Sequence, residues 1–189
     1  STLEAVLSEL LQDGTAADAV VAETAAQRLA FWGLREAVSE SERAAGGSVK
    51  HDVAVPISSL ARFIGEVHGI VERVAPGARP NIFGHVGDGS LHVNIRPPEG
   101  VALRDFARDP SLTQAIEDAV IAHGGSISAE HGIGQSKPES LYRQKSEVEL
   151  ALMRTIKAAL DPLDLFNPGK LLPSAPVDAI DIVGTPRRA

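Results

Sequence analysis

The sequence has no cysteine, no long apolar run and fewer basic than acidic residues. Without cysteine it can form neither a disulfide framework nor a metal site with thiolate ligands. No stretch approaches the ~20 apolar residues that a membrane-spanning helix needs. Lys and Arg number 18 against 25 Asp and Glu, and this net charge of −7 argues against a nucleic-acid backbone or an anionic membrane as the main partner.

What remains is the composition of an ordinary soluble protein. Its 189 residues, 43% of them hydrophobic and 23% charged, suffice for one domain with a real core. No signal-peptide pattern opens the sequence. The chain begins at Ser1 rather than at a methionine, so we expect a fragment excised from a longer protein.

Hydrophobic periodicity and turn residues predict alternating helices and short strands. Helices are expected at residues 2–12, 23–39, 57–74, 103–122 with a break near Pro110, 138–144 and 146–160. Strands are expected at residues 19–21, 50–55, 79–86, 90–96 and 126–128. This order predicts an α+β fold, with an antiparallel sheet, helices packed on one face of it, and further C-terminal helices. Residues 1–173 are predicted to form the domain and residues 174–189 a tail.

The most informative feature is a pair of histidines on either side of an Asp-Gly dipeptide. Asp88-Gly89 between two alternating runs predicts a hairpin with a tight turn at its tip. His85 then lies directly opposite His92, at a Cβ separation of about 4.5–5.5 Å. Asn94 shares their polar face, while apolar residues occupy the other face. Two imidazoles in this arrangement suit a single metal ion.

A third ligand is needed for a stable open site, and Glu130 is the best candidate. It follows a short strand and precedes Gly132 and Gly134, which permit tight turns of the backbone. Two histidines and one carboxylate leave coordination positions open for substrate and fit zinc, manganese or iron. His131 points the other way in an extended segment, so it is free to act as a general base or to cap or orient its neighbours.

Other residues carry weaker signals. Arg35 and Lys50 are candidates for binding a substrate carboxylate, although each taken alone is more typical of a solvated surface charge. The glycine-rich stretches at 84–89 and 132–134 match neither a Rossmann nor a P-loop pattern, so neither supports a nucleotide site. A hydrolytic metalloenzyme with the same ligands is a further alternative, but the chain lacks an HExxH helix.

Three segments together resemble a known family. They are residues 83–94 (FGHVGDGSLHVN), 128–134 (SAEHGIG) and 165–170 (LFNPGK). In this order they are similar to the C-terminal domain of FAD-linked oxidases of the vanillyl-alcohol oxidase superfamily. That group includes D-lactate dehydrogenases, the glycolate oxidase D subunit and D-2-hydroxyglutarate dehydrogenase. The resemblance extends over residues 15–173.

The resemblance implies oxidation of a D-2-hydroxy acid to a 2-oxo acid, with hydride transfer to FAD. It implies that a divalent metal, zinc or manganese, is bound by the residues that match the family's ligands, His85, His92 and Glu130. It makes His131 the base that takes the hydroxyl proton. The substrate residues that it implies are Arg35, Ser39, Lys50 and Asn94, and the residues towards the flavin are Asn167 and Lys170.

The family's FAD domain precedes this one and would hold most of the flavin, so we expect the fragment alone to be inactive. The expected partners are a small 2-hydroxy acid, that N-terminal FAD domain of the same protein, and an electron acceptor that is a protein or a quinone. We predict a cytoplasmic location, with peripheral attachment to a membrane as the alternative. The competing hypothesis is a structural metal site or a subunit-interaction domain without a catalytic role of its own.

Overall fold

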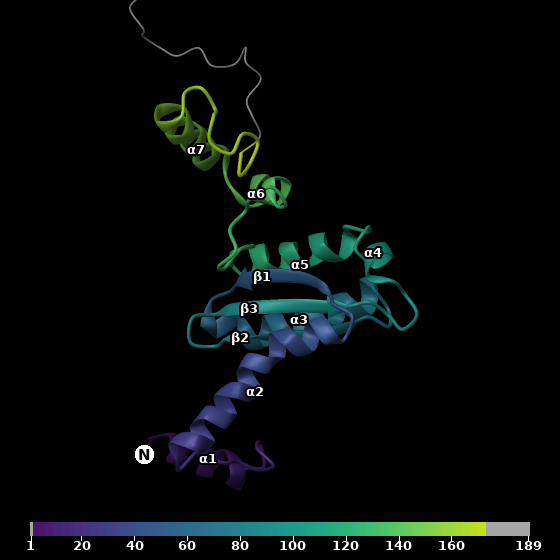
Figure 1. Ribbon diagram of the computed structural model, residues 1–189, viewed down its shortest axis with the longest axis vertical. Coiled ribbons are helices and arrows are strands. Elements are labelled where there is room, and N and C mark those ends of the chain that lie inside the picture. Colours follow the sequence, from purple (N-terminus) through teal and green to yellow (C-terminus); the bar gives the residue numbers. More distant parts are fainter. Residues whose placement is uncertain (1, 173–189) are drawn as a thin grey trace, which may run out of the picture. The chain divides into compact units, whose positions relative to one another are not determined.

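The computed structural model describes residues 2–172, apart from the side chain of Ser39, and the predicted tail at 174–189 lies outside the described residues. The chain divides into two compact units, Ser1–Gly47 and a larger unit that begins at Ser48. The architecture is α+β, as predicted (Figure 1). Among the described residues, no helix is long and apolar enough to cross a membrane.

The first unit holds two helices, α1 (Thr2–Gln12) and α2 (Ala25–Ala44). Helix α2 begins at a capping box in which the Thr24 side chain accepts from the backbone of Gln27, and the Gln27 side chain accepts from the backbone of Thr24. The strand predicted at residues 19–21 is wrong: the segment is irregular and Val20 is 71% exposed. No described strand lies beside it to pair with, and three apolar residues alone do not make a strand.

The second unit is built on a three-stranded antiparallel sheet in the order β1-β3-β2. Its strands are β1 (Val49–Ala54), β2 (Arg79–His85) and β3 (Ser90–Arg96). Its helices are the short η1 (Ile57–Ser59), α3 (Leu60–Val74), α4 (Leu103–Phe106), α5 (Ser111–Ala122), α6 (Pro138–Gln144) and α7 (Glu147–Leu160). The break predicted near Pro110 separates α4 from α5.

One face of the sheet is apolar and carries the core. Val53, Leu91 and Val93 share this face because they pair directly across the strands or alternate along them. They are buried against α3 and α5, whose inward residues include Phe63 and Ile116, neither of them exposed at all. The helices therefore cover one face, as the sequence predicted, and the opposite face is left for polar residues.

The hairpin between β2 and β3 has a different register from the one predicted. His85 pairs with Ser90, and His92 pairs with Phe83, so that residues 86–89 form a four-residue loop. The amide of Gly89 donates to the His85 carbonyl at 3.0 Å, and the Asp88 side chain accepts from the Ser90 amide at 2.9 Å. The shift is by two residues, so each side chain keeps the face that was predicted for it.

The longer loop is held against β1. The Val55 amide donates to the Gly89 carbonyl at 3.0 Å, a contact between segments far apart in the chain. Gly89 has a φ of +79°, and a Cβ on it would lie 2.0 Å from the carbonyl oxygen of Val55. Only glycine fits this approach, and a rule based on the Asp-Gly dipeptide alone does not include this tertiary contact.

The strand predicted at residues 126–128 is reduced to a single bridge, in which Ser126 and Ala54 exchange both backbone hydrogen bonds at 2.8 and 2.9 Å. A regular antiparallel continuation would bring the Ser128 amide to the carbonyl of Asp52. Instead the Ala129 amide bonds that carbonyl at 3.2 Å, and the Ser128 amide turns to the Ser126 hydroxyl. This one-residue bulge ends the pairing just before Glu130.

The C-terminal helices attach to α5 through a buried carboxylate. Glu117, 5% exposed, accepts from the Ser140 hydroxyl at 2.9 Å and from Arg143 at 3.2 Å. Leu141 and Leu150 join Leu172 in a small second core. The large exposed apolar side chains of α7 and the turn after it are Val148, Leu152, Ile156, Leu160, Leu163, Leu165 and Phe166.

The contact between the hairpin loop and β1 gives a first prediction. Gly89→Ala should reduce the free energy of unfolding by about 2 kcal/mol or more, because the added Cβ meets the Val55 carbonyl in a backbone conformation that alanine avoids. Gly100→Ala is the matched control, since Gly100 has a φ of +80° with nothing within 4 Å of the added Cβ. Urea unfolding measures both. Equal losses would contradict the importance of the Val55 contact.

Candidate metal and substrate site

The polar face of the sheet is organised around Asp52. The alternation of β1 turns His51 and Val53 into the core and leaves Asp52 on the opposite face, where it pairs across the sheet with His92. Asp52 is nevertheless only 3% exposed. Its Oδ2 atom accepts two hydrogen bonds, each of 2.8 Å, from the consecutive backbone amides of Glu130 and His131.

These bonds keep the carboxylate ionised. Burial of Asp52 acts to raise its pKa, but the backbone hydrogen bonds from Glu130 and His131 act in the other direction. The neighbouring charges of His131 and Lys137 add to them, so the pKa of Asp52 lies below its ordinary value. An anionic carboxylate therefore lies beneath the loop that carries Glu130 and His131.

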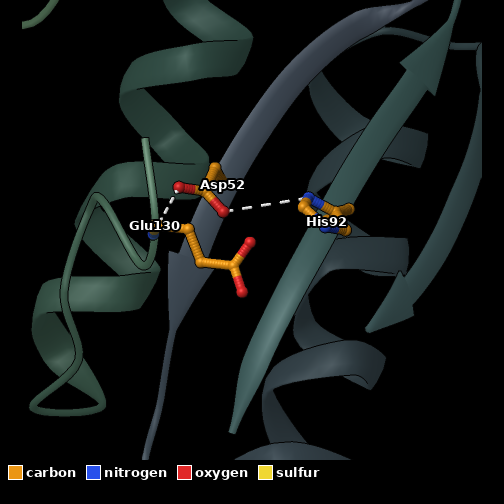
Figure 2. A group of neighbouring side chains, drawn as sticks. All are labelled: Asp52, His92 and Glu130. Carbon is orange, nitrogen blue, oxygen red and sulfur yellow. Dashed lines mark hydrogen bonds and ion pairs between the residues drawn. The ribbon is translucent and has the colours of Figure 1, made fainter. Parts of the chain in front are cut away.

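Asp52, His92 and Glu130 converge, as Figure 2 shows, from β1, β3 and the loop after the bulge. One ligand atom from each lies within 4.8 Å of those of the other two. The His92 Nδ1 atom is 3.8 Å from Asp52 Oδ1, which is buried and has no hydrogen-bond partner among the described residues. An imidazole and two carboxylates form a donor set that fits zinc or manganese, and the unsatisfied oxygen marks a polar site rather than a packed one.

His85 does not lie opposite His92 as the sequence analysis expected. Its direct partner is Ser90, so His85 and His92 are diagonal neighbours on one face of the hairpin, roughly 7–8 Å apart. The cause is the four-residue loop, whose Gly89 carbonyl accepts from the Val55 amide. The cluster of possible ligands within 4.8 Å contains His92 and Glu130 but not His85, and its third member is Asp52.

His131 lies at the edge of this cluster. Its Nδ1 atom is 3.7 Å from Asp52 Oδ2, and its ring is stacked 6.0 Å from the ring of His92, between centroids. The side chain of His131 is 65% exposed, whereas that of His92 is 25% exposed. A histidine beside a candidate metal site and open to solvent has the placement that a general base requires.

Two of the predicted substrate residues, Lys50 and Asn94, are on the same face of the sheet as this cluster. They are Cα partners across β1 and β3, two residues along each strand from the Asp52–His92 pair. Lys50 is exposed and Asn94 is 4% exposed. An exposed ammonium next to a buried amide can bind a carboxylate group at the surface of the sheet.

Arg35 belongs to the first unit, on α2. Its guanidinium carbon lies 5.1 Å from the centroid of the Trp32 ring, a cation–π contact. Both residues line a shallow hollow of about 270 Å³ together with Arg28 and Phe31. Ser39 lies on the same helix, but its side chain is outside the described part of the chain. Contact of Arg35 and Ser39 with substrate therefore stays a prediction.

The two residues expected towards the flavin are exposed and lie in a tight turn. Asn167 has a φ of +49°, and its carbonyl accepts from the Lys170 amide at 3.1 Å. The Lys170 Nζ donates to the Gln135 side chain at 2.6 Å, and the Leu171 amide donates to the Gly134 carbonyl at 2.7 Å. The turn is thus tied to the glycine loop that follows His131, although the two are far apart in the sequence.

Asp52 is the residue that the sequence analysis did not single out as functional. One feature of the sequence could have identified it: Asp52 is in the middle of the strand expected at residues 50–55, where aspartate is disfavoured, and next to the core residue Val53. Such a residue needs a specific partner, but the pattern does not show that the partner is a loop 78 residues further along the chain.

Comparison with known proteins identifies the class. Residues 1–171 match the family model of the C-terminal domain of FAD linked oxidases, and the chain belongs to this family. It is 39% identical over 168 residues to a D-2-hydroxyglutarate dehydrogenase of Xanthomonas citri pv. viticola, covering 88% of this chain and 35% of that protein. It is 36% identical over 175 residues to a mitochondrial D-2-hydroxyglutarate dehydrogenase of Arabidopsis thaliana, covering 90% of this chain and 29% of that protein.

A third relative, a D-2-hydroxyglutarate dehydrogenase of Stutzerimonas stutzeri, is 32% identical over 168 residues, with 88% of this chain and 36% of that protein covered. The chain therefore spans about a third of the length of these relatives. The resemblance stated from the three sequence segments is confirmed at the level of the family.

Behind the site, His51 gives a prediction of pH dependence. Its Nδ1–H donates to the Val93 carbonyl at 3.0 Å, its Nε2 accepts from Thr113 at 3.1 Å, and the ring is 5% exposed. Burial lowers the pKa of His51 below 6.5; the bond to Val93 opposes this and the charge of Lys137 reinforces it. The unfolded chain therefore binds a proton here that the folded chain does not, and stability falls as the pH drops below about 6.5.

His51→Asn retains a donor for Val93 but does not titrate, so its stability should fall less steeply between pH 6.5 and 5. The difference in slope can reach about 1.4 kcal/mol per pH unit. Urea unfolding at several pH values measures it, with His68→Asn as the control at an exposed histidine. Identical slopes for the wild type and the His51 variant would show that His51 is protonated in the folded protein.

Proposed function

We propose that this chain is the substrate- and metal-binding part of a flavin-dependent dehydrogenase that oxidises a D-2-hydroxy acid to a 2-oxo acid. The observation that carries the proposal is the convergence of His92 and Glu130 beside Asp52, with His131 at the edge. The relatives' names make D-2-hydroxyglutarate the first substrate to test.

The proposed metal ligands are His92, Glu130 and His85. The first two already lie within reach of one ion, and His85 is on the same face of the hairpin, diagonal to His92. When bound, the cation supplies Lewis-acid activation of the 2-hydroxyl group, and the flavin supplies a two-electron acceptor. His131 takes the hydroxyl proton, for which its exposed ring is accessible to a bound substrate.

Charge complementarity supports a carboxylate substrate at this face. Lys50 is exposed beside Asn94 and would bind a carboxylate of the hydroxy acid, with the Asn94 amide adding a hydrogen bond. Arg35 and Ser39 are further substrate residues proposed from the resemblance alone. The hydroxyl of the bound acid would then lie over His92 and Glu130, within reach of His131.

The flavin is proposed to be held mainly by an N-terminal domain of the same protein, since the chain spans about a third of the length of its relatives. Asn167 and Lys170 would face the flavin from the turn that is tied to the glycine loop. The electron acceptor, a protein or a quinone, and the cytoplasmic location stay predictions, and several relatives are named as mitochondrial.

The test uses the complete gene product that contains this chain, with its flavin bound. Anaerobic reduction of the flavin by D-2-hydroxyglutarate should slow by about 100-fold or more in His92→Ala, in Glu130→Gln, and in the wild type after chelation. Zinc or manganese should restore the chelated wild type but not the variants. His131→Gln should slow reduction while the metal content is unchanged, because His131 is proposed as the base and not as a ligand.

His68→Ala, at an exposed position of α3, is the matched control and should reduce the flavin at the wild-type rate. Equal rates in every arm would refute the catalytic role of the metal site. A chelation effect on thermal stability with no effect on flavin reduction would favour the competing function, a structural metal site in a subunit-interaction domain.

A further inference from the structure

We propose that Asp52 is a positioning residue for this site, which orients His92 and fixes the Glu130–His131 loop without itself binding the cation. The inference rests on the proposed function. It concerns a residue that shares the cluster in Figure 2 with two proposed ligands, so the role of ligand is the alternative that must be excluded.

Asp52 already holds the backbone of the loop. Its Oδ2 atom accepts from the amides of both Glu130 and His131 at 2.8 Å. The bulge at Ser128–Ala129 aims these two amides at the carboxylate, because the backbone leaves the register of β1 one residue early. The backbone of Glu130 and of His131 is therefore held by a carboxylate of β1.

His92 also lies next to the carboxylate. Its Nδ1 atom is 3.8 Å from Asp52 Oδ1, an ion-pair contact that is longer than a hydrogen bond. Nε2 is the ring nitrogen that would be left to bind a cation. In metal sites a histidine commonly binds through one nitrogen while the other donates to a carboxylate, which sets the tautomer and the ring orientation.

The exposed fractions of the three side chains agree with Asp52 as a positioning residue and with His92 and Glu130 as ligands. Asp52 is 3% exposed, whereas the side chain of His92 is 25% exposed and Glu130 is open to solvent. His92 and Glu130 are therefore the members of the cluster that would be accessible to a cation from solvent.

His131 has the same relation to the carboxylate. Its Nδ1 atom faces Asp52 Oδ2 at 3.7 Å, which leaves its Nε2 atom as the nitrogen farther from Asp52. One buried carboxylate thus lies next to the Nδ1 atoms of two stacked histidines, whose rings are 6.0 Å apart. Asp52 would orient the proposed ligand and the proposed base together, through the Nδ1 atom of each ring.

The experiment compares Asp52→Asn with His92→Ala and the wild type in the complete gene product. Asparagine has nearly the same shape as aspartate but lacks its charge, so the two amides lose charge-assisted hydrogen bonds and His92 loses its anionic neighbour. The probes are the visible absorption of the Co²⁺-loaded protein, which reports the number and type of ligands, and the affinity for Zn²⁺ measured against a chelator. Hydrogen exchange of the metal-free protein at the Glu130 and His131 amides is the third readout.

For Asp52→Asn we expect the wild-type Co²⁺ spectrum, a 10–100-fold weaker affinity for Zn²⁺ as is typical of lost outer-sphere carboxylates, and about tenfold faster exchange at the two amides. Asp161→Asn is the matched control. Asp161 is also buried and accepts from two consecutive amides, those of Leu165 and Phe166. It should accelerate exchange only at Leu165 and Phe166 and leave the affinity for Zn²⁺ unchanged.

A Co²⁺ spectrum of Asp52→Asn that shows the loss of a ligand would overturn the inference in favour of direct coordination. Unchanged affinity, or unchanged exchange at the two amides, would overturn it in favour of a merely adjacent carboxylate. If His92→Ala binds Co²⁺ as the wild type does, the proposed function fails instead, and the exchange of the metal-free protein still decides whether Asp52 positions the loop.

Discussion

The hydrogen bonds from the Glu130 and His131 amides to the Asp52 carboxylate are the constraint on which the candidate site depends. They join β1 to a loop that is otherwise attached by a single bridge and one further backbone bond to Asp52. The neighbouring residues are held by other contacts, such as the bond from the Leu171 amide to the Gly134 carbonyl, but among the described residues only these two bonds hold the amides of Glu130 and His131. They place the backbone of both residues beside His92 on β3.

The two faces of the sheet show why the site sits where it does. The apolar face is buried by α3 and α5, and the buried His51 on it satisfies both ring nitrogens within the protein. This face supplies the stability of the unit, since apolar burial is the dominant favourable contribution to folding. The other face is therefore free to hold Lys50, Asp52 and Asn94, which a core could not accommodate.

Much of this could be predicted from residue patterns, because it follows from local rules. The helices at residues 57–74 and 146–160 have clear helical periodicity, and Pro110 marks a real break. The polar face of the hairpin was assigned correctly, because a shift of the strand pairing by two residues leaves every side chain on the same face. The predicted register was wrong by two residues, since the hairpin loop has four residues rather than two. Gly89 in this loop accepts a hydrogen bond from Val55, just after β1, and the hairpin rule considers no contact outside the hairpin.

The same limit explains why Asp52 was missed while Glu130 and His131 were found. Adjacent glycines make the Glu-His pair conspicuous in the sequence, whereas the importance of Asp52 arises only when a distant loop folds onto it. Sequence patterns identify functional residues whose conformation is set by their neighbours in the chain. Residues such as Asp52, whose role depends on a distant segment, are identified only from the folded structure. A buried aspartate on a strand is the kind of local inconsistency that points to such a contact.

The environment of Asp52 is costly for folding and agrees with the positioning role proposed for it. A carboxylate that is 3% exposed carries a desolvation cost, and its two amide bonds offset this at Oδ2 only. Its Oδ1 atom has no hydrogen-bond partner among the described residues, and neither have the buried hydroxyls of Ser90 and Ser128. Ser90 lies on the polar face of the sheet, and Ser128 lies in the segment that leads to Glu130, so the unsatisfied atoms gather around the site and not in the core. Folding alone would favour apolar or fully bonded groups there, and unsatisfied polar atoms next to the proposed ligands agree with a polar site at this face of the sheet.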